Sequence, residues 1–222
     1  MRGKLIVLDG GDGSGKTVQT DLLIARFKKE GLPAQTISFP RYETPTGAIV
    51  KSYLTGAFGP PLEISAKAAS VLYATDRWAA FREGAFAPLD SGVHMVANRY
   101  AASNMAHQGS KIVDPAERTA FFRWNDELEH GTFGIPRPDL NVILHVPAET
   151  SIKLIDVRGN EKDGHENVEH LRRAEATYLD LAGTFPNFAL IECVRDGKLL
   201  SREDIHELVW AEVSAVLAVQ PT

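Results

Sequence analysis

Short apolar runs alternate with longer amphipathic stretches along the whole chain. Five of these runs have the length and aliphatic content of buried strands, namely Lys4–Asp9, Ala34–Phe39, Val93–Asn98, Leu140–Val146 and Phe188–Glu192. The stretches between them predict helices, which we place at Thr17–Glu30, Thr46–Thr55, Glu63–Phe86, Asp114–His130, Glu149–Val157, Asn167–Ala182 and Ser201–Leu217. Continuous apolar strands separated by helices predict a parallel sheet covered on both faces. Ligands of such sheets bind outside the carboxyl ends of the strands, so the residues after each strand are the candidates for a site.

The composition narrows this α/β prediction. The chain has 222 residues, of which 44% are hydrophobic and 24% charged, as in ordinary globular proteins. No internal repeat or linker is visible, and we expect a single domain over residues 1–222. The net charge of −5 argues against a nucleic-acid partner, and no apolar run approaches the roughly 20 residues of a membrane span. With no signal-peptide pattern, we expect a cytoplasmic protein. Cys193 is the only cysteine, which excludes an internal disulfide.

The loop after the first predicted strand carries the strongest functional pattern. Gly10 to Thr17 reads G-x-x-x-x-G-K-[ST], the pattern of a phosphate-binding loop between a strand and a helix. Glycines let successive backbone N–H groups turn toward an anion, and the helix adds its N-terminal dipole. Lys16 is expected at the β and γ phosphates and the Thr17 hydroxyl at Mg²⁺. A glycine-rich turn with a solvated Lys16 is the alternative. The expected ATP-binding residues are Gly10, Gly11, Asp12, Gly13, Ser14, Gly15, Lys16 and Thr17.

Arginines follow the second and third predicted strands. Phe39-Pro40-Arg41-Tyr42 follows the second strand, and Arg99 follows the third, with Ser103 and Asn104 one helical turn later. An arginine at the ligand edge of a sheet can clamp an anion with two parallel hydrogen bonds. Taken singly, each arginine could instead be solvated, and Ser103 and Asn104 could be capping or surface residues.

Two further segments are candidates for ligand contacts. Tyr73 and Arg77 are four residues apart on a predicted helix and therefore share a face, where they could bind a planar base or simply pack in the core. The segment from Arg158 to Gly164 is wholly polar and contains two glycines. It fits either a surface loop or a lid that brings cations onto phosphates.

In their order along the chain, these motifs resemble the thymidylate kinases. Six segments follow one another between Lys4 and Ala182 in the order seen in that family, namely the phosphate-binding loop, F-P-R-Y, Y-A-T-D-R-W, N-R-Y-A-A-S-N, P-R-P-D-L and a polar lid. Asp12 inside the loop is also typical of that family. The resemblance implies a three-layer P-loop kinase fold, with a five-stranded parallel sheet flanked by helices and a short lid at about 158–166. It implies transfer of the γ-phosphoryl group of ATP to dTMP with Mg²⁺, and a homodimer formed through helices.

The resemblance also implies roles for individual residues. Asp12 would contact the 3′-hydroxyl, Arg41 the acceptor phosphate, Arg77 the base and phosphate, and Asn104 the base edge. The implied catalytic residues are Asp12, Lys16, Arg99 and Arg158, with Lys162 as a second lid cation. The implied acceptor site consists of Asp12, Phe39, Arg41, Tyr42, Tyr73, Arg77, Arg99, Ser103 and Asn104. The implied metal site consists of Thr17, Asp12 and Glu169.

Several residues depart from the family pattern. Asn98 stands where the family has an Asp near Mg²⁺, so we expect weaker metal binding, which Asp9, Asp12 or Glu169 would partly offset. His145 replaces an acidic residue, Tyr73 replaces a Phe, and the lid is poor in arginine. An acceptor phosphate is already largely ionised at pH 7 because its second pKa is about 6, so no general base is required. The alternatives are a kinase of the same fold for dUMP or a deoxynucleoside, and a P-loop protein that senses ATP without turnover.

Overall fold

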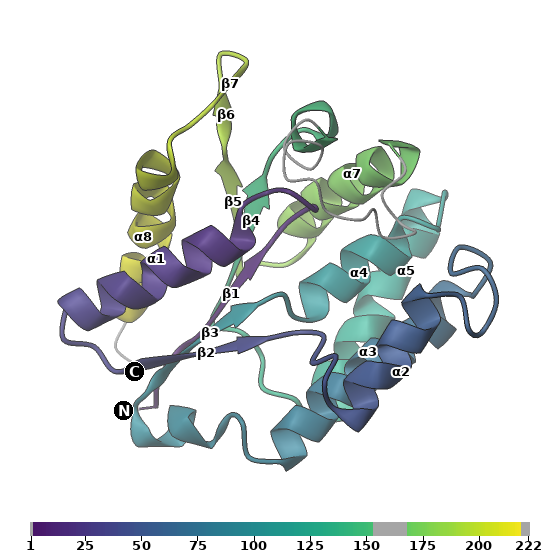
Figure 1. Ribbon diagram of the computed structural model, residues 1–222, viewed down its shortest axis with the longest axis horizontal. Coiled ribbons are helices and arrows are strands. Elements are labelled where there is room, and N and C mark those ends of the chain that lie inside the picture. Colours follow the sequence, from purple (N-terminus) through teal and green to yellow (C-terminus); the bar gives the residue numbers. More distant parts are fainter. Residues whose placement is uncertain (1, 153–167, 219–222) are drawn as a thin grey trace.

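The computed structural model describes residues 2–152 and 168–218 and is built on one five-stranded sheet (Figure 1). The strand order is β2-β3-β1-β4-β5, and every neighbouring pair is parallel. The strands are β1 (Leu5–Asp9), β2 (Ala34–Ser38), β3 (His94–Asn98), β4 (Leu140–His145) and β5 (Phe188–Glu192). All five predicted strands are thus confirmed, as is the parallel sheet. The main helices are α1 (Lys16–Lys29), α2 (Pro45–Leu54), α3 (Ala66–Arg82), α4 (Ala101–Gly109), α5 (Pro115–Asp126), α7 (Val168–Thr184) and α8 (Arg202–Ala218).

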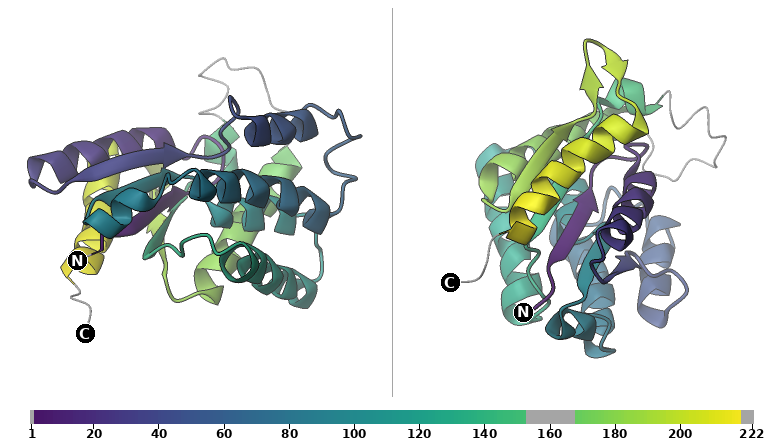
Figure 2. Two further views of the ribbon diagram at one scale, coloured as in Figure 1. Left: turned by 90° about the horizontal axis from the view of Figure 1, so that it is seen from below. Right: turned by 90° about the vertical axis from the view of Figure 1, so that its left-hand side faces the viewer.

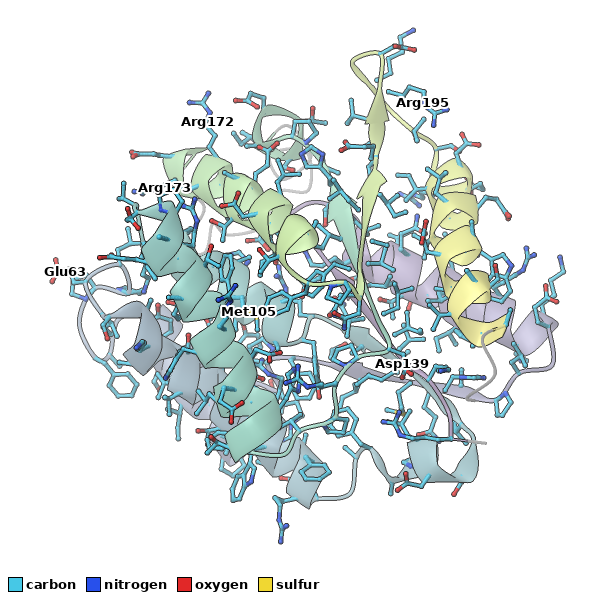
Figure 3. All side chains as sticks on the ribbon, turned by 180° about the vertical axis from the view of Figure 1, so that it is seen from behind. Glu63, Met105, Asp139, Arg172, Arg173 and Arg195 are labelled. Carbon is cyan, nitrogen blue, oxygen red and sulfur yellow. The ribbon has the colours of Figure 1, made fainter. Side chains whose placement is uncertain are left out.

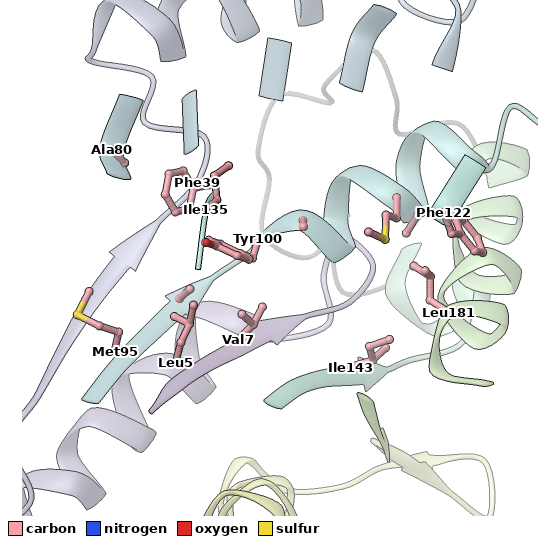
Figure 4. Packing of buried hydrophobic residues seen from close by; sticks show 14 of the residues in the cluster. Leu5, Val7, Phe39, Ala80, Met95, Tyr100, Phe122, Ile135, Ile143 and Leu181 are labelled. Carbon is pink, nitrogen blue, oxygen red and sulfur yellow. The ribbon is translucent and has the colours of Figure 1, made fainter. Parts of the chain in front are cut away.

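The sheet separates two apolar cores because side chains of successive strand residues point to opposite faces. In the central strand β1, Leu5 and Val7 pack with Phe39 after β2, with Tyr100 before α4, and with residues of α3, α4, α5 and α7, as Figure 4 shows for part of this core. Ile6 and Leu8 point to the opposite face and pack with residues of α1 and α8. Figures 1 and 2 show the resulting three layers, with the sheet between the two groups of helices. This is the arrangement expected for a P-loop kinase.

Local capping determines where the helices begin. The side chains of Thr44, Ser65 and Asp114 accept hydrogen bonds from the backbone N–H groups three residues later, which satisfies a donor that the first helical turn leaves open. The predicted helix Glu63–Phe86 was therefore too long at both ends. It begins after Ser65 and ends at Arg82, before Gly84 with its φ of 82°. The predicted helix Glu149–Val157 is helical at 148–152, and the rest lies outside the described residues.

No range was predicted for α4, which was expected only as the helix that carries Ser103 and Asn104. Three further features were not predicted as separate elements. The predicted helix Asp114–His130 divides into α5 and a π-helix, η2 (Glu127–Thr132), and a short 3₁₀ helix, η1 (Ala87–Ser91), precedes β3. A hairpin of β6 (Val194–Arg195) and β7 (Lys198–Leu199) projects beyond the sheet, and Arg195 lies on it (Figure 3). No described helix is long and apolar enough to cross a membrane.

Candidate active site

The loops after β1 and β3 lie next to each other because these strands are paired. Leu8 is opposite Asn98 in the register, and the backbone N–H of Arg99 donates to the carbonyl of Leu8 at 3.0 Å. The phosphate-binding loop and the Asn98-Arg99 turn therefore share one edge of the sheet. Arg99 has a φ of 66°, a left-handed conformation that is unfavourable for a bulky residue and occurs mostly where the surroundings enforce it.

The phosphate-binding loop has the conformation that its glycines predict. Gly10, Gly13 and Gly15 have φ values of 139°, 79° and 87°. A Cβ on Gly10 would lie 2.5 Å from the Leu144 carbonyl oxygen, so a side chain there would displace the loop from β4. The Lys16 ammonium donates to the carbonyl oxygens of Gly10 and Gly11 at 3.0 and 2.7 Å and so lies across the loop, beside the expected phosphates.

An open space of about 950 Å³, its solvent-filled mouth included, adjoins this loop. It is lined by Lys16 and Thr17 of α1, by Asn98 at the end of β3 and Arg99 after it, and by Arg202 at the start of α8. The Asn98 amide nitrogen donates to the Thr17 hydroxyl oxygen at 3.3 Å. We did not predict Arg202, because no sequence motif marks it. Its backbone carbonyl accepts a hydrogen bond from Gln19 at 2.9 Å, which ties α8 to α1.

A second pocket lies on the other side of Asp12 and Arg99. It contains about 710 Å³ of space, its mouth included, within the range of small-molecule sites. The lining residues come from the loop, the segments that follow β2 and β3, and helices α2, α3 and α4, namely Asp12, Phe39, Pro40, Tyr42, Leu54, Tyr73, Arg77, Arg99, Tyr100, Ser103, Asn104, His107 and Gln108. The structure thus brings together every predicted acceptor residue except Arg41. His107 and Gln108 were not predicted, although both follow Asn104 by about one turn of the same helix.

Arg99 connects the two spaces through a cluster of polar contacts. One guanidinium nitrogen pairs with the Asp12 carboxylate, and the other donates to the Ser103 hydroxyl at 2.9 Å and lies 3.4 Å from Nε2 of His107. Burial alone would raise the pKa of Asp12, but the charges of Arg99 and Lys16 outweigh it and hold this pKa well below its usual range. Asp12 is therefore an ionised carboxylate at neutral pH.

Arg41 takes a different position from the one expected. Its guanidinium contacts α3, where Nε is 3.2 Å from Asp76 and Nη1 is 2.5 Å from Glu83. A third hydrogen bond of 3.2 Å joins Nη2 to the Asp76 carbonyl. Arg41 does not line the second pocket, because it is held by Asp76 within α3 and by Glu83 at the C-terminal cap of this helix.

Asp9, at the end of β1, is an internal anchor. Its Oδ1 accepts hydrogen bonds from the backbone N–H of Gly10 at 2.9 Å, the Ser103 hydroxyl at 2.5 Å and the Tyr178 hydroxyl at 2.7 Å. Gly10 begins the loop, whereas Ser103 lies on α4 and Tyr178 on α7, two helices that cover the same face of the sheet. Asp9 therefore holds the loop, α4 and α7 together.

Arg77 and Asn104 of this pocket belong to a buried network of hydrogen bonds. Arg77 of α3 donates from Nε and Nη2 to the two carboxylate oxygens of Glu129, each at 2.5 Å, and both side chains are almost fully buried. Asn104 and Asn125 donate to the same carboxylate at 3.4 and 3.1 Å. Glu129 was not predicted because it pairs with residues far away in the sequence.

The remaining predicted positions lie near the end of the chain. Glu169 is exposed in the first turn of α7, 3.7 Å from Arg173. Arg158 and Lys162, together with the predicted lid at 158–166, lie outside the described residues. His145, at the end of β4, lies 2.8 Å from Glu175 of α7 and 2.6 Å from Glu192 of β5, so it joins two strand ends to a helix.

Comparison with known proteins identifies the family. A family model described as thymidylate kinase matches residues 8–205, which is most of the chain. The chain belongs to the thymidylate kinase family. A probable thymidylate kinase of Pyrococcus horikoshii is 31% identical, covering 96% of this chain and 97% of that protein. A thymidylate kinase of Neisseria gonorrhoeae is 29% identical over 88% of this chain and 91% of that protein.

A solved structure shows the same fold. The thymidylate kinase of Candida albicans superposes with a TM-score of 0.74 at 20% identity, covering 96% of this chain and 92% of that one. Membership of the thymidylate kinase family makes the chain a nucleoside monophosphate kinase, a class of phosphotransferase. The reaction of such kinases needs two nucleotides side by side, and the structure has two adjacent spaces that share Arg99.

Proposed function

We propose that this enzyme transfers the γ-phosphoryl group of ATP to dTMP, giving dTDP and ADP. The observation that carries the proposal is that the loop-side space and the second pocket share Asp12, Phe39 and Arg99 in their walls. A triphosphate on the loop and a monophosphate in the pocket would therefore meet at Arg99. Direct transfer between two bound nucleotides requires such an arrangement, because the reacting oxygens must be close and in line.

The charges around this meeting point fit the reaction. The nucleophile is a phosphate oxygen of the acceptor, already ionised near pH 7, so this chain needs to supply only alignment and positive charge. Lys16 lies at the loop where the β and γ phosphates would bind, and Arg99 lies between the two nucleotides. Asp12 holds Arg99 in place and is directed toward the acceptor sugar.

Mg²⁺ fits the residues beside the loop. The Thr17 hydroxyl and the Asp12 carboxylate both face the loop-side space, and hydroxyl and carboxylate oxygens are the ligands that Mg²⁺ prefers. These two residues would hold the ion together with the nucleotide and water, and Glu169 is a further candidate from α7. When bound, Mg²⁺ would neutralise charge on the triphosphate.

In the acceptor pocket, Tyr73 would stack on the base, and Arg77 and Asn104 would lie at the base edge. The sugar and phosphate would be surrounded by Phe39, Tyr42 and Ser103. Arg41 would reach the acceptor phosphate only after releasing Asp76 or Glu83. The lid residue Arg158 would supply a cation at the transferred group.

We also propose a homodimer through α3. Val71 and Trp78 are seven residues apart on this helix and remain 38% and 41% exposed, and Ile49 on the neighbouring α2 is 42% exposed. Residues seven apart lie on one face of a helix, and a second copy would cover these large apolar side chains. Sedimentation of the parent and a Trp78→Glu variant tests the interface, since the variant is expected to be monomeric.

A coupled assay of ADP formation with dTMP, dUMP, dCMP and dGMP tests the proposed function. We expect turnover with dTMP and loss of turnover in Lys16→Ala, with Lys28→Ala, a basic residue at the far end of the same helix, as the control. Turnover with dUMP alone would favour a different pyrimidine kinase. ATP binding without turnover on any acceptor would favour a nucleotide-sensing protein.

A further inference from the structure

The buried carboxylate of Glu129 determines which hydrogen-bonding groups the neighbouring side chains can offer to the acceptor pocket. Glu129 is fully buried and is contacted by four N–H donors, two from Arg77 and one each from Asn104 and Asn125. An ionised carboxylate only accepts hydrogen bonds. Each neighbour must therefore turn a nitrogen toward Glu129.

For Arg77 this requirement fixes the whole guanidinium. Nε and Nη2 are both used by Glu129, and the group lies over the Tyr100 ring at 5.9 Å from its centroid. Among the described residues, Nη1 of Arg77 has no hydrogen-bond partner. Because Arg77 lines the acceptor pocket, Nη1 is the N–H group that it can offer to a ligand there.

For Asn104 the same requirement fixes the direction of the amide. Its nitrogen donates to Glu129, to the Asn125 side-chain oxygen at 3.0 Å and to the Ser70 carbonyl at 3.2 Å. The Asn125 amide is itself oriented by donating its nitrogen to Glu129. The Asn104 oxygen is buried and has no partner among the described residues. Since Asn104 also lines the pocket, it can offer a ligand an acceptor.

We propose that Glu129 is a positioning residue that fixes the hydrogen-bonding order of the acceptor pocket, a donor at Arg77 beside an acceptor at Asn104. Thymine and uracil present the complementary order, with the O4 acceptor beside the N3–H donor. Cytosine presents the reverse, with an amino donor at N4 beside an acceptor at N3. Glu129 thereby selects thymine or uracil over cytosine without contacting the base, and this inference rests on the proposed function.

The position of Glu129 behind the pocket depends on a π-helical turn. The turn that contains Glu129 is a π-helix, η2 (Glu127–Thr132), wider than the α-helical turns before it. Glu129 points inward with Asn125, the last buried residue of α5, and the two side chains contact each other. Single π-turns within α-helices are frequent at functional sites, and here the turn brings a carboxylate behind two pocket residues.

Glu129→Gln tests the proposal because it keeps the shape and removes the obligatory acceptor. We expect the ratio of kcat/KM for dTMP to that for dCMP to fall about tenfold or more, as discrimination by paired hydrogen bonds is lost. KM for ATP is expected to stay unchanged. Glu127→Gln, an exposed residue of the same turn, is the matched control and should keep the parent ratio. Glu129→Asp, which retains the carboxylate, should keep the ratio within about threefold, whatever its KM.

The outcomes separate this inference from the proposed function. A parent enzyme without dTMP turnover contradicts the proposed function. A parent with dTMP turnover whose Glu129→Gln variant keeps the dTMP-to-dCMP ratio overturns the role of Glu129, as does an equal fall in Glu129→Asp. If Glu129→Gln fails to fold by circular dichroism, Asn125→Ala gives the second test. It leaves the carboxylate in place, so a retained ratio supports Glu129 and a tenfold fall overturns its role.

Discussion

Asn98→Asp tests the effect of an amide, rather than a carboxylate, beside the proposed Mg²⁺ site. In the structure the Asn98 nitrogen donates to the Thr17 hydroxyl oxygen at 3.3 Å, so it uses a lone pair that a metal ion would otherwise share. An aspartate reverses this contact. The Thr17 hydroxyl would donate its hydrogen to the carboxylate and keep its oxygen lone pairs for Mg²⁺.

The new charge adds a second effect. A carboxylate about 5 Å from a divalent cation in a water-filled site contributes about 1.7 kcal/mol, which corresponds to roughly 15-fold tighter binding. Asn98 lines the open loop-side space, so the dielectric constant of water is the appropriate choice, and salt will screen part of the gain. We therefore expect the apparent Mg²⁺ dissociation constant to fall about tenfold at low ionic strength.

The measurement is calorimetric binding of ATP over a series of Mg²⁺ concentrations without acceptor, so it does not depend on turnover. Asn98→Ala is the control, since it removes the hydrogen bond without adding charge and should change the Mg²⁺ dependence by less than about twofold. If Asn98→Asp binds Mg²⁺ within twofold of the parent, the reasoning about this position is wrong.

Three further predictions concern stability and nucleotide binding. Arg77→Met removes the ionic partner of the buried Glu129 and should lower the free energy of unfolding, measured in urea, by about 3–5 kcal/mol. Adding Glu129→Leu removes the buried charge and should restore most of this loss. No recovery in the double variant would contradict the prediction. Burial lowers the pKa of His145, but the carboxylates of Glu175 and Glu192 outweigh it and the net pKa is raised. The stabilisation that protonated His145 gives the folded state is therefore complete below the unfolded pKa of about 6.5, and it is lost as the pH rises through the folded pKa. His145→Gln should accordingly lower the free energy of unfolding more at pH 6 than at pH 9. An equal loss at both pH values would refute this prediction. Arg202→Ala should raise KM for ATP about fivefold, the effect of about 1 kcal/mol, and leave KM for dTMP unchanged, whereas Arg195→Ala on the hairpin should alter neither.

Local patterns in the sequence predicted the framework of the fold. The strands were visible because each is a continuous apolar run, and the phosphate-binding loop because its glycines are spaced for one backbone conformation. The hairpin was missed although its signal was present. Asp196 and Gly197 have φ values of 51° and 72°, and an Asp-Gly pair between two short strands is the usual sequence of such a turn.

Long-range contacts were beyond the sequence patterns. The position of Arg41 depends on Asp76 and Glu83, 35 and 42 residues away, and Glu129 pairs with Arg77 across 52 residues. Glu129 also lies in a polar stretch that reads as an exposed helix surface. A carboxylate in such a stretch becomes buried only because donors from other helices surround it, and no single segment contains that information.

The order in which the strands are synthesised has a consequence for folding in the cell. The central strand β1 is buried along its whole length, yet its neighbours β3 and β4 begin only at residues 94 and 140. At about 5–20 residues per second, the ribosome needs on the order of ten seconds to complete β4 after β1. During that time β1 has an open edge that is apolar on both faces, a surface prone to pair with other chains. We expect the strand that ends in the phosphate-binding loop to be the part of the nascent chain that most needs a chaperone.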